Sequence, residues 1–373
     1  MSQSKELQDI LAALREGGKP RALATVIEAR GSTYRRAGAR LLILENGSTI
    51  GGISGGCLEA DICARSEHIA GDGRPALVTY DHTSDADLVF GLALGCNGVI
   101  RVLVEPMSER ELPGYLRAVE NSLALRQPVA VAVVVGGAGD LRHQPGERLW
   151  IGADNAIGGE LGQSPYACQI VDSARMALDS GRSELKIYGD GPGEVEIFVE
   201  TVRPPLALTI FGAGHDAIPL ADLAKRLGWH VTVVDGRPAY AARERFPSAD
   251  EVRLCRAEAV PDEISLEGTA AAVVMNHNYH HDRAILAHLL GSPVPYIGML
   301  GPRRRTQKML EELARNGSSF DETRLSRLHA PIGLDIGAET PEQVALSIVA
   351  EILAAASNRS GAPLKYREAP IHG

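Results

Sequence analysis

A glycine-rich loop near residue 55 carries side chains well placed for chemistry. Gly55 and Gly56 precede Cys57, and Leu58 and Glu59 begin a stretch with helical spacing of apolar residues. The helix dipole and free backbone N–H groups favour a thiolate at such a position, and glycines let a ligand approach the backbone. Gly55, Gly56, Cys57 and Glu59 are therefore candidate cofactor-binding residues. The alternative is a small buried cysteine at a turn, which is the commoner role of a free thiol.

A basic loop lies just upstream, between residues 30 and 40. Guanidinium groups and hydroxyl donors suit a phosphate or a polyanionic cofactor. The candidate residues here are Ser32, Arg35, Arg36 and Arg40. A solvated run of charge is the alternative. A second thiol, Cys96, stands in another glycine turn, and two cysteines in separate glycine loops indicate one shared pocket.

Residues 206–235 follow the order strand, glycine turn, helix, strand, which is typical of a Rossmann-type unit. Gly212 permits a tight turn, and Gly214 lets the backbone approach a pyrophosphate. Asp235 ends the second strand, where an acid accepts hydrogen bonds from ribose hydroxyls and repels a 2′-phosphate. We therefore expect Gly212, Gly214, His215 and Asp235 to contact any bound nucleotide, which would be NAD-like. The fold alone does not establish a ligand.

A histidine-rich loop, Asn276 to Asp282, follows another predicted strand. Loops at the carboxyl ends of parallel strands line one crevice, so we expect His277 to face the Gly212 turn. Histidines there can bind a metal or act as acid or base. The spacing matches no established zinc motif, and polar loop contacts are the alternative.

Residues 1–203 are predicted to form a mixed α/β domain. An amphipathic helix covers residues 1–16, and Asn46-Gly47 is a hairpin turn between two strands. Arg203-Pro204-Pro205 interrupts the pattern and predicts a domain joint. The sequence shows no internal repeat.

Residues 206–373 alternate buried strands with helices, which predicts a doubly wound, Rossmann-type parallel sheet. The last helix begins at a capping box, Thr340-Pro341-Glu342-Gln343. Its only polar stripe consists of Gln343, Ser347 and Glu351. We therefore expect this helix to be mostly buried and to serve packing.

Composition narrows the class of protein. The chain has 373 residues, 45% of them hydrophobic, and a formal net charge of −9, which favours a globular protein and gives no reason to expect nucleic-acid or anionic-membrane binding. No stretch is long and apolar enough to span a bilayer, and no early run resembles a signal peptide. Five cysteines without a CxxC pair argue against a disulfide framework, so we expect a cytoplasmic protein.

The chain closely resembles the xanthine dehydrogenase accessory family, XdhC/CoxI, over nearly its whole length. The matching stretches are Gly31–Arg40, Gly51–Glu59, Phe211–Ala217, Val233–Pro238, Tyr296–Arg304 and Leu328–Glu342. The resemblance implies a chaperone rather than an enzyme, which binds molybdenum cofactor, assists its sulfuration and hands it to a molybdenum hydroxylase such as xanthine dehydrogenase. The expected partners are that apoenzyme, a cysteine desulfurase-type sulfur donor and a second copy of the chain.

The chain departs from the family pattern at a few loop positions. Ser54 and Asn97 stand where the family often has glycine, Tyr34 where it often has proline, and Asn278 where it often has aspartate. The added bulk at Ser54 and Asn97 indicates a change in cofactor affinity or in recipient enzyme. The missing carboxylate at position 278 weakens an acid–base or metal role for that loop.

Two other classes of function stay open. The first is an NAD(P)-dependent oxidoreductase that uses Gly212, Gly214, Asp235 and His277. The second is a redox-sensing or protein-binding module that uses the two loop thiols. An oxidoreductase requires a positioned acid or base beside the nicotinamide.

Overall fold

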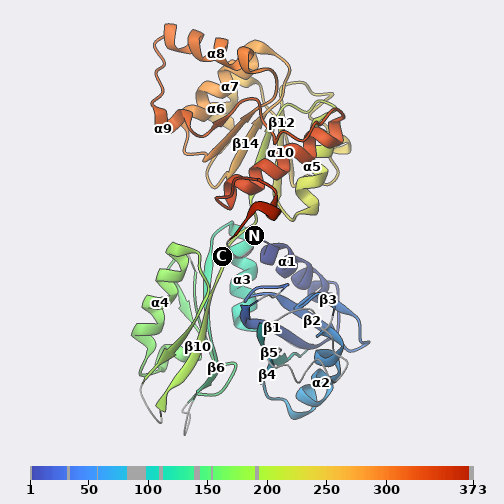
Figure 1. Ribbon diagram of the computed structural model, residues 1–373, viewed down its shortest axis with the longest axis vertical. Helices are drawn as coiled ribbons and strands as arrows, with labels where there is room; N and C mark the ends of the chain where they lie inside the picture. The colour runs from blue at the N-terminus through green and yellow to red at the C-terminus, as the bar shows by residue number, and fades with distance from the viewer. Residues whose placement is uncertain are drawn as a thin grey trace. The chain divides into compact units, whose positions relative to one another are not determined.

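The computed structural model describes residues 2–31, 34–56, 58–81, 98–108, 112–137, 143–152, 154–189 and 193–368. The chain divides into two compact units, Met1–Pro204 and Pro205–Gly373 (Figure 1). No described helix is both long enough and apolar enough to cross a membrane.

The N-terminal unit contains the same series of elements twice. The first series is α1 (Ser2–Arg15), β1 (Pro20–Gly31), β2 (Arg40–Leu44), β3 (Thr49–Gly51), α2 (Glu59–Asp72), β4 (Ala76–Asp81) and β5 (Gly98–Pro106). The second is α3 (Gly114–Leu125), β6 (Val129–Gly137), β7 (Arg148–Ile151), β8 (Ile157–Gly158), α4 (Ala167–Ser180), β9 (Glu184–Tyr188) and β10 (Val195–Val202), with a short 3-10 helix, η2 (Glu160–Gln163), before α4.

The two series also share one topology. Their sheets have the orders β3-β2-β1-β5-β4 and β8-β7-β6-β10-β9, and neighbouring strands are antiparallel in both. The register repeats as well, because Thr25 lies opposite Arg40 in the first sheet and Val133 opposite Arg148 in the second. The prediction that the chain has no internal repeat is therefore wrong. We call residues 2–106 the first half and residues 114–202 the second half.

Special backbone positions repeat too. Gly51 and Gly159 have φ angles of 86° and 102°, and a Cβ on either would lie within 2.3 and 2.2 Å of the carbonyl oxygens of Arg40 and Arg148. Only glycine fits such a position without a backbone shift. The repeat thus preserves a steric requirement where the strands β3 and β8 end.

Crossed ion pairs join the two halves. Arg40 of the first half binds Glu200 of the second, with Nη1 donating to Oε1 at 2.9 Å, and Arg148 of the second half binds Glu105 of the first, with Nη2 donating to Oε2 at 2.5 Å. Each arginine also donates to the carbonyl oxygen of the glycine two residues before it. All four side chains are at most 10% exposed. Both pairs therefore hold the halves together from inside.

The two sheets lie between two helices. On its outer face each sheet packs against its own helix, through Ile62 of α2 in the first half and Ile170 of α4 in the second. Their inner faces share one cluster made of Ile27, Leu103, Val133, Val135 and Phe198. Helices α1 and α3 add a further apolar cluster with both sheets. The layer order is α2, sheet, sheet, α4 (Figure 1).

The C-terminal unit is a doubly wound α/β domain, which confirms the predicted fold class. Its elements are β11 (Ala207–Phe211), α5 (Ala217–Arg226), β12 (His230–Asp235), β13 (Glu251–Leu254), α6 (Val260–Glu263), β14 (Ala271–Val274), α7 (Tyr279–Gly291), β15 (Tyr296–Met299), α8 (Arg303–Arg315), α9 (Glu322–Leu325), β16 (Leu328–His329) and α10 (Pro341–Ala356). The strands are all parallel, in the order β13-β12-β11-β14-β15-β16. This order reverses between β11 and β14, where such folds bind ligands.

Helix α10 shows both the value and the limit of the sequence pattern. Its capping box is present, with Thr340 and Gln343 bonding reciprocally. The polar stripe does not face solvent as its residue types suggest, because Ser347 is buried and its hydroxyl donates to the carbonyl oxygen of Leu334. Leu346 and Leu353 are exposed instead. Glu351 also accepts from buried groups, including the hydroxyl of Tyr296. Hydrogen-bond partners inside the unit therefore turn Ser347 and Glu351 inward, opposite to the orientation that hydrophobicity predicts.

Candidate functional site

Two residues hold the glycine-rich loop rigid. Oε1 of Glu59, at the start of α2, accepts from the backbone N–H groups of Ile53 and Ser54 at 3.1 and 2.8 Å. The Ser54 hydroxyl donates to Oε2 of Glu59 and accepts from the N–H groups of Gly56 and Leu58, both at 3.1 Å. Burial alone would raise the pKa of Glu59, but these hydrogen bonds hold it below its usual value. The N–H groups of Ile53, Ser54, Gly56 and Leu58 are thus engaged by side chains of the same loop and helix.

Glu6 of α1 links this loop to the basic loop. Its Oε1 accepts from the N–H of Gly52 at 2.7 Å, and its Oε2 binds Nη2 of Arg35. Burial raises the pKa of Glu6 above its usual value, against the lowering effects of Gly52 and Arg35. Nothing in the sequence points to Glu6, because it lies in a separate helix far from both loops along the chain.

The three candidate arginines have different environments. Arg36 is exposed, and its guanidinium has no hydrogen bond or ion pair within the described part of the chain. Arg35 is partly buried against Glu6. Arg40 is buried against Glu200 and cannot reach a ligand, so its assignment to a phosphate site is corrected to a structural role. The physical reason is that a buried guanidinium needs a carboxylate partner, and Glu200 provides it.

Tyr34 is a further residue at this site. Its ring contacts the loop, since a Cβ on Gly55 would lie 3.8 Å from it, yet the side chain is 70% exposed. Gly31, where the basic loop begins, lies opposite Gly98 in the sheet. Ser32, Cys57 and Cys96 lie outside the described residues, so their roles stay predictions. Of the described candidates, Arg36, Gly55 and Gly56 are exposed, and the exposed Tyr34 ring lies beside Gly55.

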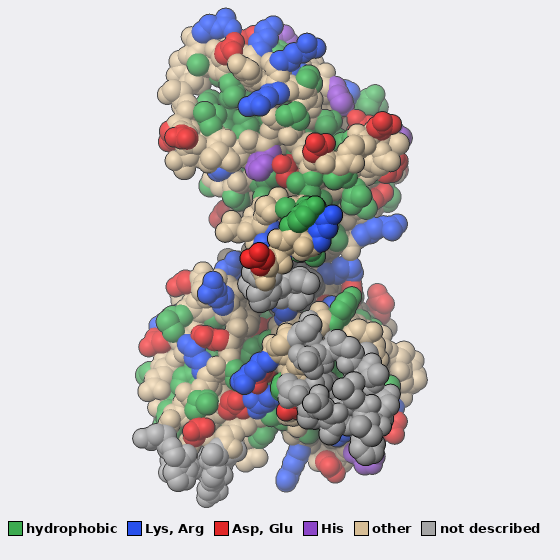
Figure 2. Space-filling model, in the orientation of Figure 1, with side chains coloured by type: hydrophobic (Ala, Val, Ile, Leu, Met, Phe, Trp, Pro, Cys, Tyr) green, Lys and Arg blue, Asp and Glu red, His purple; other side chains and the backbone are tan. Residues whose placement is uncertain are grey.

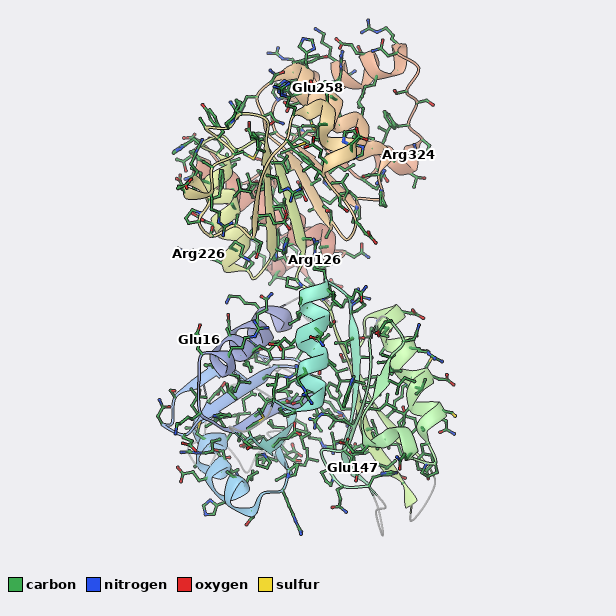
Figure 3. The ribbon with its side chains drawn as sticks, turned by 180° about the vertical axis from the view of Figure 1, so that it is seen from behind. Glu16, Arg126, Glu147, Arg226, Glu258 and Arg324 are labelled. Carbon is green, nitrogen blue, oxygen red and sulfur yellow. The ribbon has the colours of Figure 1, made fainter. Side chains whose placement is uncertain are left out.

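The equivalent loop of the second half has a different chemistry. Ser164 there bonds Nε2 of His143 at 3.0 Å, and Nδ1 of His143 lies 2.8 Å from Glu147, which Figure 3 labels. The 3-10 helix η2 occupies the position of Gly52–Gly55. The second half keeps Gly159 as the counterpart of Gly51 but has no pair of adjacent glycines between Gly159 and α4 like Gly55 and Gly56.

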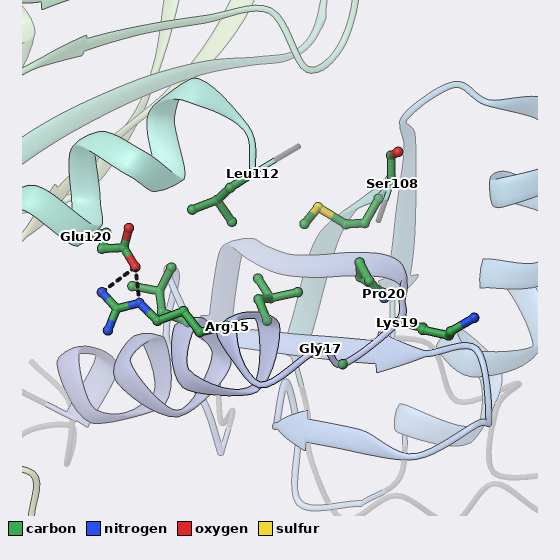
Figure 4. A pocket seen from close by; sticks show the side chains of 11 residues that line it. Arg15, Gly17, Lys19, Pro20, Ser108, Leu112 and Glu120 are labelled. Carbon is green, nitrogen blue, oxygen red and sulfur yellow. Dashed lines mark hydrogen bonds and ion pairs between the residues drawn. The ribbon is translucent and has the colours of Figure 1, made fainter. Parts of the chain in front are cut away.

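A pocket of about 300 Å³ lies elsewhere in this unit, between α1 and α3 (Figure 4). Arg15 and Glu120 form an ion pair at its edge. Apolar side chains, including Leu11, Leu14 and Met107, line much of the rest. It contains none of the predicted site residues, so we do not place the cofactor there.

In the C-terminal unit, the two turn glycines differ in what they do. Gly212 has a φ angle of 113°, and a Cβ there would lie 2.6 Å from the carbonyl group of Met275. Gly212 is therefore required by the close approach of β14. A Cβ on Gly214 would meet no atom within 4 Å, so that glycine leaves open space beside the turn. His215 is exposed in the same turn.

A polar pocket of about 230 Å³ opens at the carboxyl ends of β12, β13 and β14. It is lined by Asp235, Gly236, Arg237, Arg256, Glu258, Asn276, Asn278 and His281, of which Glu258 is labelled in Figure 3. Asp235 is buried, and burial alone would raise its pKa. Hydrogen bonds from Arg237 and from the N–H of Ala213 outweigh that effect and hold the pKa below its usual value. Asp235 is therefore a stable anion at the edge of the pocket.

The histidine loop faces the glycine turn, as expected. Nε2 of His277 lies 3.5 Å from Asp216, directly before α5, and His277 has a φ angle of 58°. Asn278 caps α7 by accepting from the N–H groups of His280 and His281 at 3.0 and 3.2 Å. No group of three or more potential metal ligands occurs among the residues that the structure places. The contacts of Asn278 are those of a helix cap.

Basic side chains gather over α8 at the top of the C-terminal unit (Figure 2). Arg303, Arg304 and Lys308 are exposed there. Arg305 is turned inward, where its Nη2 donates to buried Asp282 at 2.7 Å. Exposed cations thus cover α8, while Arg305 joins α8 to α7.

The fold and the glycine turn define the C-terminal unit as a Rossmann domain, which follows a duplicated α/β unit along the chain. A family described as the XdhC Rossmann domain matches residues 208–352, and the XdhC and CoxI family matches residues 14–81 and 122–189, one segment in each half. The chain belongs to the XdhC and CoxI family.

Relatives match over most of the chain. A Bacillus subtilis protein described as a probable subunit of xanthine dehydrogenase is 33% identical over 92% of this chain and 96% of its own length. The molybdenum cofactor insertion chaperone PaoD of Escherichia coli is 24% identical over 90% of this chain and 83% of its own. A crystal structure described as a xanthine dehydrogenase from Bacillus halodurans has a TM-score of 0.76 and 30% identity, and covers 97% of this chain and 99% of that one.

We expect Cys57 to be the most reactive thiol of the glycine-rich loop region. Burial raises the pKa of Cys63, and burial together with Glu263 raises that of Cys255 to about 11, so both are largely protonated at neutral pH. Alkylation rates measured against pH, with the modified peptides identified by mass spectrometry, test this. A Cys168→Ser background removes an exposed competitor. Faster reaction at Cys63 than at Cys57 would contradict the assignment.

Proposed function

We propose that this protein binds molybdenum cofactor at the glycine-rich loop of its first half and delivers it to a molybdenum hydroxylase of the xanthine dehydrogenase type. The observation that carries the proposal is the end-to-end similarity to relatives named for xanthine dehydrogenase and for cofactor insertion. Support from the site is chemical. The exposed Tyr34 ring lies beside Gly55, Gly56 follows with no side chain, and Arg36 provides an exposed guanidinium two residues after Tyr34 in the basic loop.

The rigid loop suits a carrier. Glu6 and Glu59 fix its backbone before any cargo binds, so little ordering is needed on binding. Cys57 is proposed to lie near the dithiolene end of the cofactor and to take part in its sulfuration, with sulfur supplied by a cysteine desulfurase. The apoenzyme is the proposed recipient, and the cofactor is cargo rather than a reagent.

The proposal predicts a specific role for Arg36. Arg36→Ala should weaken binding of isolated molybdenum cofactor about ten- to hundredfold, because one charge-assisted contact to its phosphate contributes roughly 1.5–3 kcal/mol. Equilibrium binding to the full chain, read out by protein-bound molybdenum, measures the change. Arg175→Ala, an exposed arginine on α4 of the second half, is the matched control and should bind like wild type. Equal affinities for Arg36→Ala and wild type would remove Arg36 from the site.

Delivery is tested separately. The loaded protein should activate a cofactor-free molybdenum hydroxylase. The protein alone should neither form NADH from NAD+ with a purine or an aldehyde as the electron donor, nor consume NADH with an aldehyde as the acceptor. Turnover by the protein alone, abolished by His277→Ala, would favour the oxidoreductase alternative.

We also propose that the C-terminal unit binds a nucleotide at the carboxyl ends of β11, β12 and β14. The strand order reverses there, Gly214 leaves open space beside the turn, and the 230 Å³ pocket adjoins Asp235. Gly214→Ala should keep the fold, since it meets no atom within 4 Å, and weaken the binding.

A further inference from the structure

The carboxylate of Asp235 has no acceptor site left for a ligand. An ionised carboxylate offers about four lone-pair sites, two on each oxygen. Oδ1 accepts from the backbone N–H and from Nε of Arg237, both at 2.9 Å. Oδ2 accepts from the N–H of Ala213 at 2.8 Å and from Nη2 of Arg237 at 2.7 Å. Asp235 therefore cannot also accept from ribose hydroxyls while Arg237 keeps this position.

Arg237 is held from two directions and still borders the pocket. Its guanidinium carbon lies 3.7 Å from the centroid of the Tyr240 ring, while its Nε and Nη2 bind Asp235. A cation–π contact and charge-assisted hydrogen bonds together fix the guanidinium plane. The side chain is nevertheless 48% exposed. Within the described residues Nη1 has no hydrogen-bond partner, so this edge is available to a ligand.

A second guanidinium borders the same pocket. Arg256 is exposed, and the described chain provides no hydrogen bond or ion pair for its guanidinium. Gly236 allows the backbone of Arg256 to lie close to the end of β12, since a Cβ on Gly236 would lie 3.3 Å from the Cα of Arg256. Glu258 is the other acidic residue of the lining, and among the described residues it forms no ion pair with either arginine. Beside the position expected for the ribose, the pocket thus presents mainly the guanidinium groups of Arg237 and Arg256, which are hydrogen-bond donors.

We propose that this pocket takes a nucleotide whose ribose carries a 2′-phosphate, with Arg237 and Arg256 as its ligands and Asp235 as the residue that positions Arg237. Guanidinium groups bind phosphate through paired N–H donors, whereas a ribose diol requires an acceptor that Asp235 no longer supplies. The inference rests on the proposed nucleotide binding by this unit. It reverses the NAD-like preference expected from an acid at the end of β12.

Calorimetric titration of the full chain with 5′-AMP and with adenosine 2′,5′-bisphosphate tests the proposal. We expect wild type to bind the bisphosphate at least about tenfold more tightly, as one added charge-assisted contact implies. Arg237→Ala should abolish the preference, because it removes a phosphate ligand and frees Asp235 to accept from the ribose. Arg237→Lys should keep part of it, since the charge stays but the paired donors do not. Arg245→Ala is the matched control: this arginine lies 4.7 Å from the same Tyr240 ring but does not line the pocket.

The outcomes separate the two proposals. Equal or tighter binding of 5′-AMP by wild type would overturn the 2′-phosphate inference and leave nucleotide binding intact. An unchanged preference in Arg237→Ala would remove Arg237 from the site. Binding of neither probe at millimolar concentration would overturn the nucleotide proposal itself. An unchanged unfolding midpoint of each variant, measured by Trp229 fluorescence in a Trp150→Phe background, shows that the unit is folded.

Discussion

Arg40→Met should lower the free energy of unfolding of the N-terminal unit by about 3–5 kcal/mol, because it leaves the carboxylate of Glu200 buried without its partner. Burial would lower the pKa of Arg40, but Glu200 raises it above its usual value, so Arg40 keeps its charge inside the unit. Arg148→Met should have a similar but smaller effect through Glu105, since the second pair is also buried but less completely. Losses of similar size for the two substitutions would show that the equivalent ion pairs of the two halves have equivalent roles.

Denaturation can follow each unit separately. The chain has two tryptophans, Trp150 in the N-terminal unit and Trp229 in the C-terminal unit. In a Trp229→Phe background, urea unfolding followed by fluorescence therefore measures the N-terminal unit.

A double variant is the control for charge burial. Arg40→Met combined with Glu200→Leu should recover most of the loss, because an apolar pair of similar volume needs no desolvation. A loss below about 1 kcal/mol for Arg40→Met would show that Glu200 reaches water, and would contradict the structure.

Gly212→Ala should destabilise the C-terminal unit by about 2–4 kcal/mol. A φ angle of 113° is unfavourable for alanine, and the new Cβ would lie 2.6 Å from the backbone of Met275. Because that contact is with backbone, β11 or β14 must shift. Trp229 fluorescence in a Trp150→Phe background measures the effect.

Gly214→Ala is the matched comparison for the same turn. Its Cβ meets nothing within 4 Å and Gly214 has no positive φ, so stability should change by less than about 0.5 kcal/mol. Binding of a nucleotide that approaches this backbone should nevertheless weaken. If both variants were equally stable, the close approach of β14 to Gly212 would be wrong.

Local signals along the chain determine much of the C-terminal unit. The turn at Gly212, the strand that ends at Asp235 and the capping box at Thr340 each depend on residues a few positions apart, and the structure contains all three. The parallel doubly wound sheet follows from the alternation of buried strands and helices. These features need no knowledge of distant partners, which explains why sequence analysis finds them.

The internal repeat is hard to detect in the sequence. Arg40 and Arg148, Gly51 and Gly159 occupy equivalent positions, but the identities are scattered between strands whose other residues vary within the apolar set. Many combinations of apolar side chains fill a core of the same shape, so fold similarity outlasts residue identity. The glycines and arginines were the available signal.

Residue type and loop context predict which groups can bind an anion, and only tertiary contacts decide which are free to do so. Arg40 has the residue type and the loop position expected of a phosphate ligand, but its guanidinium is bound to Glu200, a residue distant along the chain. Asp235 stands where a ribose ligand is expected, yet Arg237 and Ala213 occupy its oxygens. A buried charge requires full satisfaction of its hydrogen bonds, so the partners that folding brings together determine whether it remains a ligand.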